Sequence, residues 1–269
     1  MGRSTTRIQD IDVIEDSDDL PDTAPAIVMI HGWPDTWHLW DHQVSALRGR
    51  YRCVRFTLAG FDIDKAARPT SLAQMIELFS AIVDHAGRGQ PVTLLLHDWG
   101  CLFGYQFALA RPDKVARVIG VDVGDAASAA FKNSLGTKAK LMVAGYQLWL
   151  VLAWKIGGQL GDRMTRWMAK ALRCTSDPAR IGVQMNYPYA MQWLGALGGF
   201  KGVRAMVPVW PMLFIYGQRK PFMFHSNGWS QGLAARAGSA ALGLRAGHWV
   251  MRDQPVAFNQ AVLDWLAKS

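Results

Sequence analysis

Short apolar runs alternate with segments of helical spacing along most of the chain. Runs with so few polar residues predict strands that are buried on both faces of a sheet. These runs are AIVMI at 26–30, YRCVRFTL at 51–58, VTLLLH at 92–97, VARVIGVD at 115–122, MLFIY at 212–216 and AALGL at 240–244. Helical spacing of apolar residues occurs at 37–47, 71–85, 101–110 and 254–267. Because strands and helices alternate, we expect an α/β fold with a mostly parallel central sheet and helices on both faces.

The pattern changes between residues 126 and 205, where helical spacing occurs without strands. Leu141–Trp154 is almost wholly apolar, and Arg163–Leu172 is amphipathic. A run of 14 residues is too short to cross a bilayer, so we expect a buried or interfacial helix at 141–154. The predicted domains are a core of residues 1–125 and 206–269 and a helical cap of residues 126–205, inserted after the sixth strand of the core. Whether Arg7–Pro25 supplies one edge strand or two stays open.

The basic residues are concentrated in this predicted cap. The whole chain has 29 Lys and Arg against 21 Asp and Glu, a net charge of +8. The cap alone has eleven basic residues against the two acids Asp162 and Asp177, so the remainder of the chain is close to neutral. The basic residues recur at helical intervals without a nucleic-acid-binding motif, so we predict a solvated face and no nucleic-acid partner. Contact of the cap with an acidic membrane surface is a less favoured alternative.

Composition and cysteine usage narrow the class of protein. Half of the 269 residues are apolar, so the chain can bury a full core, and disordered, collagen-like and coiled-coil classes are excluded. The three cysteines, Cys53, Cys101 and Cys174, are far apart, which favours a reducing compartment. Met1–Asp22 is polar and lacks the apolar stretch of a secretory signal. We therefore expect a cytoplasmic protein, while the oligomeric state is not indicated.

Three loops at the carboxyl ends of predicted strands combine histidine, glycine and tryptophan. They read HGWPDTW at 31–37, HDWG at 97–100 and GHW at 247–249. Open parallel sheets bind their ligands at the carboxyl ends of strands. In the second loop a strand turns into a helix at Asp98, which lifts that side chain above the sheet. Asp98 is therefore the candidate nucleophile, and its alternative role is to cap the following helix.

The order and content of these loops resemble the α/β-hydrolase family. The closer resemblance is to its epoxide hydrolase and haloalkane dehalogenase branch, which carries an Asp-Trp pair at the nucleophile elbow. It covers about residues 26–269 and implies the α/β-hydrolase fold. The sequence departs from the family at Leu96, where a small residue is usual. It also departs after Tyr216-Gly217, where Arg219 and Lys220 stand in place of the usual triad acid.

An aspartate nucleophile favours chemistry at a saturated carbon. Attack by Asp98 would form an alkyl ester that water can cleave, whereas a serine would form an unreactive ether. His248 resembles the family histidine in order and context and is the predicted base that activates water; a buried structural histidine is the alternative. The backbone amides of Trp33 and Trp99 are expected to form the oxyanion hole. His31 is expected to be structural.

The triad also needs an acid that holds the imidazole and stabilises its charged form. Asp122, at the end of the run VIGVD, follows the sixth strand, where some haloalkane dehalogenases place theirs. We nominate Asp122 and give Asp125 as the second choice. A turn or capping role for Asp122, and a dyad without an acid, are the alternatives.

Tyrosines in the cap distinguish the two branches of the family. Epoxide hydrolases use two cap tyrosines to donate hydrogen bonds to the opening epoxide oxygen, whereas dehalogenases hold the halide with N–H groups. Tyr146 resembles the first of these tyrosines. Tyr187 or Tyr189, on either side of Pro188, resembles the second. Trp33 replaces the Asn that many dehalogenases carry after His-Gly, so epoxide opening is favoured.

The sequence therefore predicts an enzyme that hydrolyses an apolar epoxide to a vicinal diol, with water as the second substrate and no cofactor or metal. The many Trp, Met and Phe residues imply an apolar pocket. One alternative is a haloalkane dehalogenase that uses Trp99 as a halide donor. Another is a hydrolase-fold protein that has lost turnover, which Lys220 and Leu96 suggest.

Overall fold

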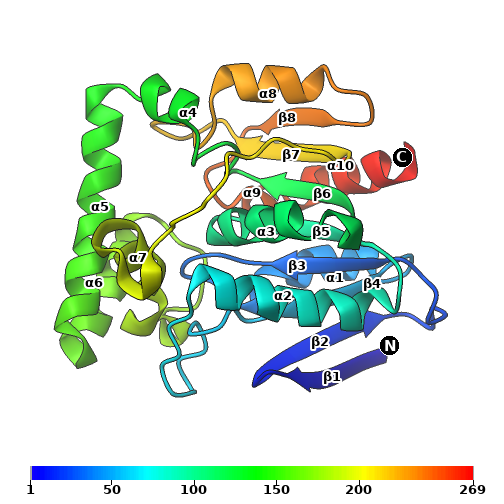
Figure 1. Ribbon diagram of the computed structural model, residues 1–269, viewed down its shortest axis with the longest axis horizontal. Coiled ribbons are helices and arrows are strands. Elements are labelled where there is room, and N and C mark those ends of the chain that lie inside the picture. Colours follow the sequence, from blue (N-terminus) through cyan, green and yellow to red (C-terminus); the bar gives the residue numbers. More distant parts are fainter. Residues whose placement is uncertain (1, 269) are drawn as a thin grey trace.

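An eight-stranded sheet runs through the molecule and supports the three candidate loops (Figure 1). The computed structural model describes residues 2–268. The strands are β1 (Gly2–Ile8), β2 (Ile11–Ser17), β3 (Ala26–Ile30), β4 (Arg52–Phe56), β5 (Val92–His97), β6 (Val115–Val121), β7 (Met212–Gly217) and β8 (Ala240–Leu244). Their order in the sheet is β1-β2-β4-β3-β5-β6-β7-β8. The strands from β3 to β8 are parallel, and β1 and β2 form an antiparallel edge.

Helices cover both faces of this sheet (Figure 1). They are α1 (Asp41–Leu47), α2 (Leu72–Gly87), α3 (Trp99–Ala110), α4 (Ala129–Ser134), α5 (Thr137–Ile156), α6 (Gly158–Ala171), α7 (Tyr187–Leu194), α8 (Asn227–Ala234), α9 (Val250–Asp253) and α10 (Pro255–Lys268). Short 3-10 turns lie at η1 (Trp37–Trp40), η2 (Pro112–Lys114), η3 (Pro178–Arg180), η4 (Val183–Asn186) and η5 (Ala196–Gly198). α1, α9 and α10 bury one face of the sheet, and α2 and α3 bury the other. The predicted α/β fold is confirmed.

The amino-terminal segment supplies two edge strands, which answers the question that the sequence left open. β2 pairs with β4, and this pairing neutralises two arginines inside the sheet. Arg52 of β4 forms an ion pair with Glu15 at 3.1 Å, and Arg55 forms one with Asp16 at 2.9 Å. Because a buried charge needs a partner, the acidic start of the chain is required beside β4.

The segment between β6 and β7 forms helices without strands, as predicted. α5 is longer than the expected 141–154 and is followed at Gly157 by α6, which packs beside it. The helices α4 to α7 lie beyond the carboxyl ends of the strands (Figure 1). We call residues 126–205 the cap, and the exact division from the core stays a prediction. Within residues 2–268, none of the helices is both long and apolar enough to span a membrane.

Candidate active site

Asp98 occupies a sharp turn between β5 and α3. Its backbone has φ 52° and ψ −121°, a conformation that an L-residue adopts only under strain. A side chain at Gly100 would place its Cβ 2.4 Å from the carbonyl oxygens of Ile30 and His31, so the turn needs glycine there. Asp98 stands at the helix start but makes no capping hydrogen bond with its side chain. The capping alternative is therefore wrong, and the carboxylate is left free for other partners.

Leu96, the unusual residue before this turn, is accommodated by a glycine in the facing helix. Leu96 is fully buried on β5. A Cβ at Gly104 of α3 would lie 2.6 Å from Leu96 Cδ2, which means that the leucine fills the space of a missing side chain. The departure from the family pattern thus leaves the elbow intact.

His248 lies between two carboxylates. Its Nδ1 donates a hydrogen bond to Asp122 Oδ2 at 2.5 Å, and its Nε2 lies 3.4 Å from Asp98 Oδ2. Asp122 is fully buried and also accepts a hydrogen bond from the backbone amide of Gly217 at 2.9 Å. The predicted Asp98, His248 and Asp122 therefore lie in contact, with the imidazole between the two carboxylates.

Asp125, the second choice for the acid, has a different role. Its carboxylate accepts hydrogen bonds from the amide and hydroxyl of Ser226, each at 2.7 Å, and from the hydroxyl of Ser128, also at 2.7 Å. These bonds tie the start of the cap to the loop after β7. Asp125 is therefore a structural residue in this arrangement.

Lys220 stands at the usual position of the acid and forms an ion pair with Asp122. Burial raises the pKa of Asp122, but the charges of Lys220 and His248 outweigh burial and lower this pKa to about 2. Burial lowers the pKa of His248, but Asp122 and Asp98 outweigh it and raise the pKa to about 9. For Asp98, burial is likewise outweighed by His248, so its pKa is lowered. These pKa shifts favour an imidazolium between two carboxylates at neutral pH.

The two predicted oxyanion-hole amides both act on the Asp98 carboxylate. The amide of Trp33 donates to Asp98 Oδ1 at 2.8 Å, and the amide of Trp99 contributes to lowering the pKa of this carboxylate. The indole of Trp33 points elsewhere and donates to Asn186 Oδ1 in the cap at 2.8 Å. Asn186 in turn donates to Thr165 Oγ1 at 2.8 Å. Trp33 therefore connects the nucleophile to the cap.

Of the three candidate tyrosines, two line the pocket above Asp98. Tyr146 and Tyr189 lie edge to face with 6.1 Å between ring centroids, and Tyr189 packs on Trp99 at 5.1 Å. The hydroxyl of Tyr187 donates instead to the carbonyl of Ala59 at 3.0 Å, away from the pocket. The choice between Tyr187 and Tyr189 therefore falls on Tyr189, and Tyr187 joins the cap to the core.

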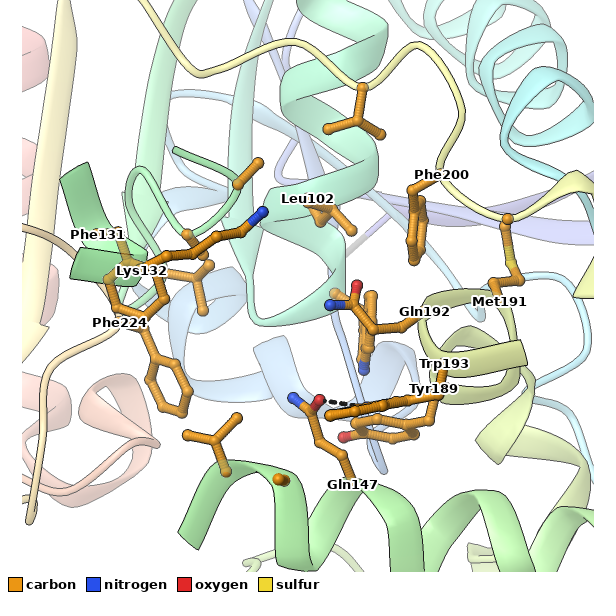
Figure 2. A pocket seen from close by; sticks show the side chains of 18 of the residues that line it. Leu102, Phe131, Lys132, Gln147, Tyr189, Met191, Gln192, Trp193, Phe200 and Phe224 are labelled. Atoms are coloured by element: carbon orange, nitrogen blue, oxygen red, sulfur yellow. Dashed lines mark hydrogen bonds between the residues drawn. The ribbon is translucent and has the colours of Figure 1, made fainter. Parts of the chain in front are cut away.

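The pocket has a volume of about 870 Å³ and lies between the cap and the carboxyl ends of the strands. Its walls are mainly apolar, with Leu102, Phe131, Met191, Phe200 and Phe224 around the space that Figure 2 shows. Asp98 is its single acidic lining residue among those described. Such a lining favours an apolar ligand.

A hydrogen-bonded relay behind Tyr146 was not predicted from the sequence. The indole of Trp193 donates to Gln147 Oε1 at 2.8 Å (Figure 2), and the Gln147 amide donates to the Tyr146 hydroxyl oxygen at 3.1 Å. The hydroxyl proton of Tyr146 is thereby left free for a ligand. The available signal was one amide side chain inside an otherwise apolar helical run.

Three further polar residues of the loops at 31–37 and 97–100 are buried near Asp98 and His248. His31 accepts a hydrogen bond from the amide of Leu58 at 2.9 Å, in keeping with its expected structural role. Burial lowers the pKa of His97 to about 3, and its ring lies 4.6 Å from that of His248. Burial raises the pKa of Asp35 to about 6. His97 and Asp35 were not predicted as site residues.

Comparisons with known proteins agree with this fold. A family model described as alpha/beta hydrolase fold matches residues 25–153. The cis-3-alkyl-4-alkyloxetan-2-one decarboxylase of Xanthomonas campestris is 33% identical over 111 residues, which is 38% of this chain and 37% of that protein. Epoxide hydrolase B of Mycobacterium tuberculosis is 34% identical over 112 residues, which is 40% of this chain and 31% of that protein. The matched region thus spans about a third of the length of each of these relatives.

Solved structures resemble nearly the whole chain. A variant of the Bacillus megaterium epoxide hydrolase with its diol product has a TM-score of 0.69 at 18% identity, covering 98% of this chain and all of that one. A loop variant of a haloalkane dehalogenase from Bradyrhizobium elkanii has a TM-score of 0.66 at 15% identity, covering 99% and 96%. At such identities the likeness shows the fold. The chain is therefore an α/β-hydrolase-fold protein, similar to the epoxide hydrolases and haloalkane dehalogenases.

Proposed function

We propose that this protein hydrolyses an apolar epoxide to a vicinal diol through a covalent ester on Asp98. The observation that carries the proposal is that Asp98 lines one pocket together with Tyr146 and Tyr189 of the cap, while His248 Nε2 lies 3.4 Å from its carboxylate. Epoxide opening needs a nucleophile, a donor for the developing alkoxide and a base for the later water attack. The pocket supplies the first two, and His248 beside Asp98 supplies the third.

In the first step Asp98 Oδ2 attacks an epoxide carbon. The ring C–O bond breaks, and the departing oxygen accepts a hydrogen bond and then a proton from the tyrosine pair. Burial and the Asp98 charge raise the pKa of both hydroxyls, so they stay protonated at neutral pH and can donate. Oδ1 is held by the Trp33 amide at 2.8 Å, which leaves Oδ2 as the attacking atom.

In the second step His248 Nε2 takes a proton from water, and the hydroxide attacks the Asp98 ester carbonyl. Charge develops on Oδ1, where the amides of Trp33 and Trp99 stabilise it. Esterification removes the negative charge of Asp98, one of the two that raise the pKa of His248. The imidazolium therefore returns a proton through solvent to the tyrosinate left by ring opening, and the neutral imidazole can act as the base. When the tetrahedral intermediate collapses, the ester C–O bond breaks and the hydroxyl proton of the intermediate passes to the departing alkoxide, which leaves as the diol. The Asp98 carboxylate, the tyrosine hydroxyl and the imidazolium are thereby restored.

The proposal is tested with a styrene-oxide-type epoxide and ¹⁸O-labelled water. In a single turnover the label is expected in the Asp98 carboxylate and not in the diol, because water attacks the protein ester. His248→Gln is expected to accumulate the ester, which mass spectrometry of the intact chain detects, and Asp98→Asn is the matched control that forms none. Label in the diol during the first turnover, or ligand binding without ester or diol, would contradict the proposal.

The alternatives from the sequence are weaker on this geometry. A halide site needs two converging N–H donors, and the Trp33 indole is already bonded to Asn186. The two features that suggested lost turnover both have partners: Leu96 packs into the gap at Gly104, and Lys220 pairs with Asp122. Halide release from a haloalkane without diol formation from an epoxide would restore the dehalogenase alternative.

A further inference from the structure

The outer face of α5 is an uncovered apolar stripe. Leu141, Leu148, Leu152 and Ile156 follow one another at intervals of seven and four residues, so they lie on one side of the helix. Each is between 46% and 69% exposed. The opposite side of the same helix is buried against the rest of the molecule. A water-exposed helix normally carries polar residues on such a face.

The neighbouring helix α6 extends this apolar surface. Its Leu160 and Trp167 are 56% and 57% exposed, and Trp167 packs on Trp149 of α5 with 5.0 Å between ring centroids. Of the 15 large apolar residues that are exposed within residues 2–268, eleven belong to the cap. Exposed apolar surface is thus gathered on one part of the molecule, which marks an interaction surface. α5 and α6 form the edge of the molecule farthest from the sheet (Figure 1).

The helices that carry this surface also carry positive charge without acidic partners. Residues 137–173 contain seven basic side chains, Lys138, Lys140, Lys155, Arg163, Arg166, Lys170 and Arg173. None of the seven takes part in an ion pair within the described part of the chain. Two of them have other surroundings, because Lys140 lines the pocket and Arg166 Nε donates to the carbonyl of Ile181 at 2.9 Å, which leaves five for the outer face. The one acid in this stretch is Asp162. Its carboxylate accepts a hydrogen bond from the backbone amide of Val183 at 2.8 Å. The outer face is therefore both apolar and strongly cationic.

The charge decides which partner fits. A second copy of the chain, docked by two-fold symmetry, would place the same cations opposite one another and be repelled. An anionic bilayer accepts both features, because apolar side chains enter the headgroup region while Lys and Arg meet lipid phosphates. We propose that the outer face of α5 and α6 docks on the surface of an anionic lipid bilayer. This inference does not depend on the proposed catalytic activity.

Docking in this way would bring the pocket close to the lipid. Lys140 and Gln147 of α5 line the pocket, and the next residues in the chain, Leu141 and Leu148, belong to the exposed stripe. An apolar compound dissolved in the bilayer would therefore meet the cap beside the pocket. This consequence, unlike the docking itself, rests on the proposed function.

Vesicle flotation of the intact chain tests the proposal. We expect binding to phosphatidylcholine vesicles that contain roughly one third phosphatidylglycerol, little binding to phosphatidylcholine alone, and release as salt rises. Leu152→Glu combined with Trp167→Glu should lower the partition coefficient at least about tenfold. The matched control is Val256→Glu on α10, which changes an apolar residue that is 82% exposed on the core and should leave binding unchanged.

A charge variant provides an independent measurement. Lys155→Glu with Lys170→Glu should also lower binding to anionic vesicles and remove its salt dependence, whereas Arg236→Glu on the core should not. Failure of the folded wild-type chain to float with anionic vesicles would overturn the proposal. So would a dimer, seen by sedimentation velocity, that Leu152→Glu dissociates. Diol formation from a water-soluble epoxide, measured on the same variants, reports the catalytic proposal separately.

Discussion

Lys220 is expected to set the pH at which His248 works. Its ammonium group pairs with Asp122, which in turn holds the imidazole, so positive charge stands on the far side of the carboxylate from His248. This charge opposes protonation of His248. Replacing Lys220 with Met keeps most of the side-chain volume and removes the charge. We therefore expect the pKa of His248 to rise in Lys220→Met.

The size of this effect follows from the arrangement of the three groups. The ammonium and the imidazole bind the two oxygens of one carboxylate, so two hydrogen-bond lengths and the width of that group put them roughly 6 Å apart. At an effective dielectric constant of about 20, two unit charges at that separation interact by ~2.8 kcal/mol. This energy corresponds to about two pH units in the pKa of His248. If only neutral His248 can activate water, ester hydrolysis at pH 7 should slow by up to about a hundredfold.

The assay is the rate of ester hydrolysis against pH in single-turnover experiments. Rapid quenching and mass spectrometry follow the Asp98 ester in wild type, Lys220→Met and Lys220→Arg. We expect the rising limb of this pH–rate profile to move to higher pH in Lys220→Met. In Lys220→Arg, which keeps the charge, the limb should stay near its wild-type position. A limb that stays in place in Lys220→Met, in a protein with unchanged circular dichroism, would refute the electrostatic reasoning.

Three further predictions concern other contacts. Gln147→Leu removes the donor to Tyr146 and should slow ester formation about five- to tenfold, in line with one hydrogen bond of ~1 kcal/mol, with no added effect in Tyr146→Phe. Gly104→Ala should cost about 1–3 kcal/mol in urea unfolding, and a double-mutant cycle with Leu96→Ala should show coupling above ~1 kcal/mol. Burial raises the pKa of Asp35 to about 6, so its ionisation should remove roughly 2 kcal/mol of stability as pH rises from 4 to 7, and Asp35→Asn should lack this loss.

The candidate nucleophile could be predicted from its neighbours in the sequence, whereas the residues around it in space could be predicted only in part. Asp98 follows a buried strand and precedes a helix, and both signals lie within a few residues of it. The link between Asp122 and Lys220 depends on the pairing of β6 with β7, which brings together residues 98 positions apart. The sequence therefore left the triad acid open between Asp122, Asp125 and none.

The second feature that the sequence pattern could not predict is the rotation of a cap helix about its own axis. Tyr187 and Tyr189 are two positions apart on α7 and therefore point in nearly opposite directions. Which of them faces the pocket depends on how Asn186 is held by Trp33. The run 141–154 was similarly ambiguous, because it is apolar on every side; its buried and exposed faces are set by the packing of the cap.

The contact between Trp33 and Asn186 also bears on how freely the cap could be exchanged. The amide of Trp33 belongs to the catalytic machinery proposed here, and its indole is buried against a residue of the cap. A cap taken from another protein would fit this core only if it offered an acceptor where Asn186 stands. Without one, a buried indole N–H would lose its partner at a cost of about 1–3 kcal/mol. Cap and core are therefore matched parts, joined at the residue that also binds the nucleophile.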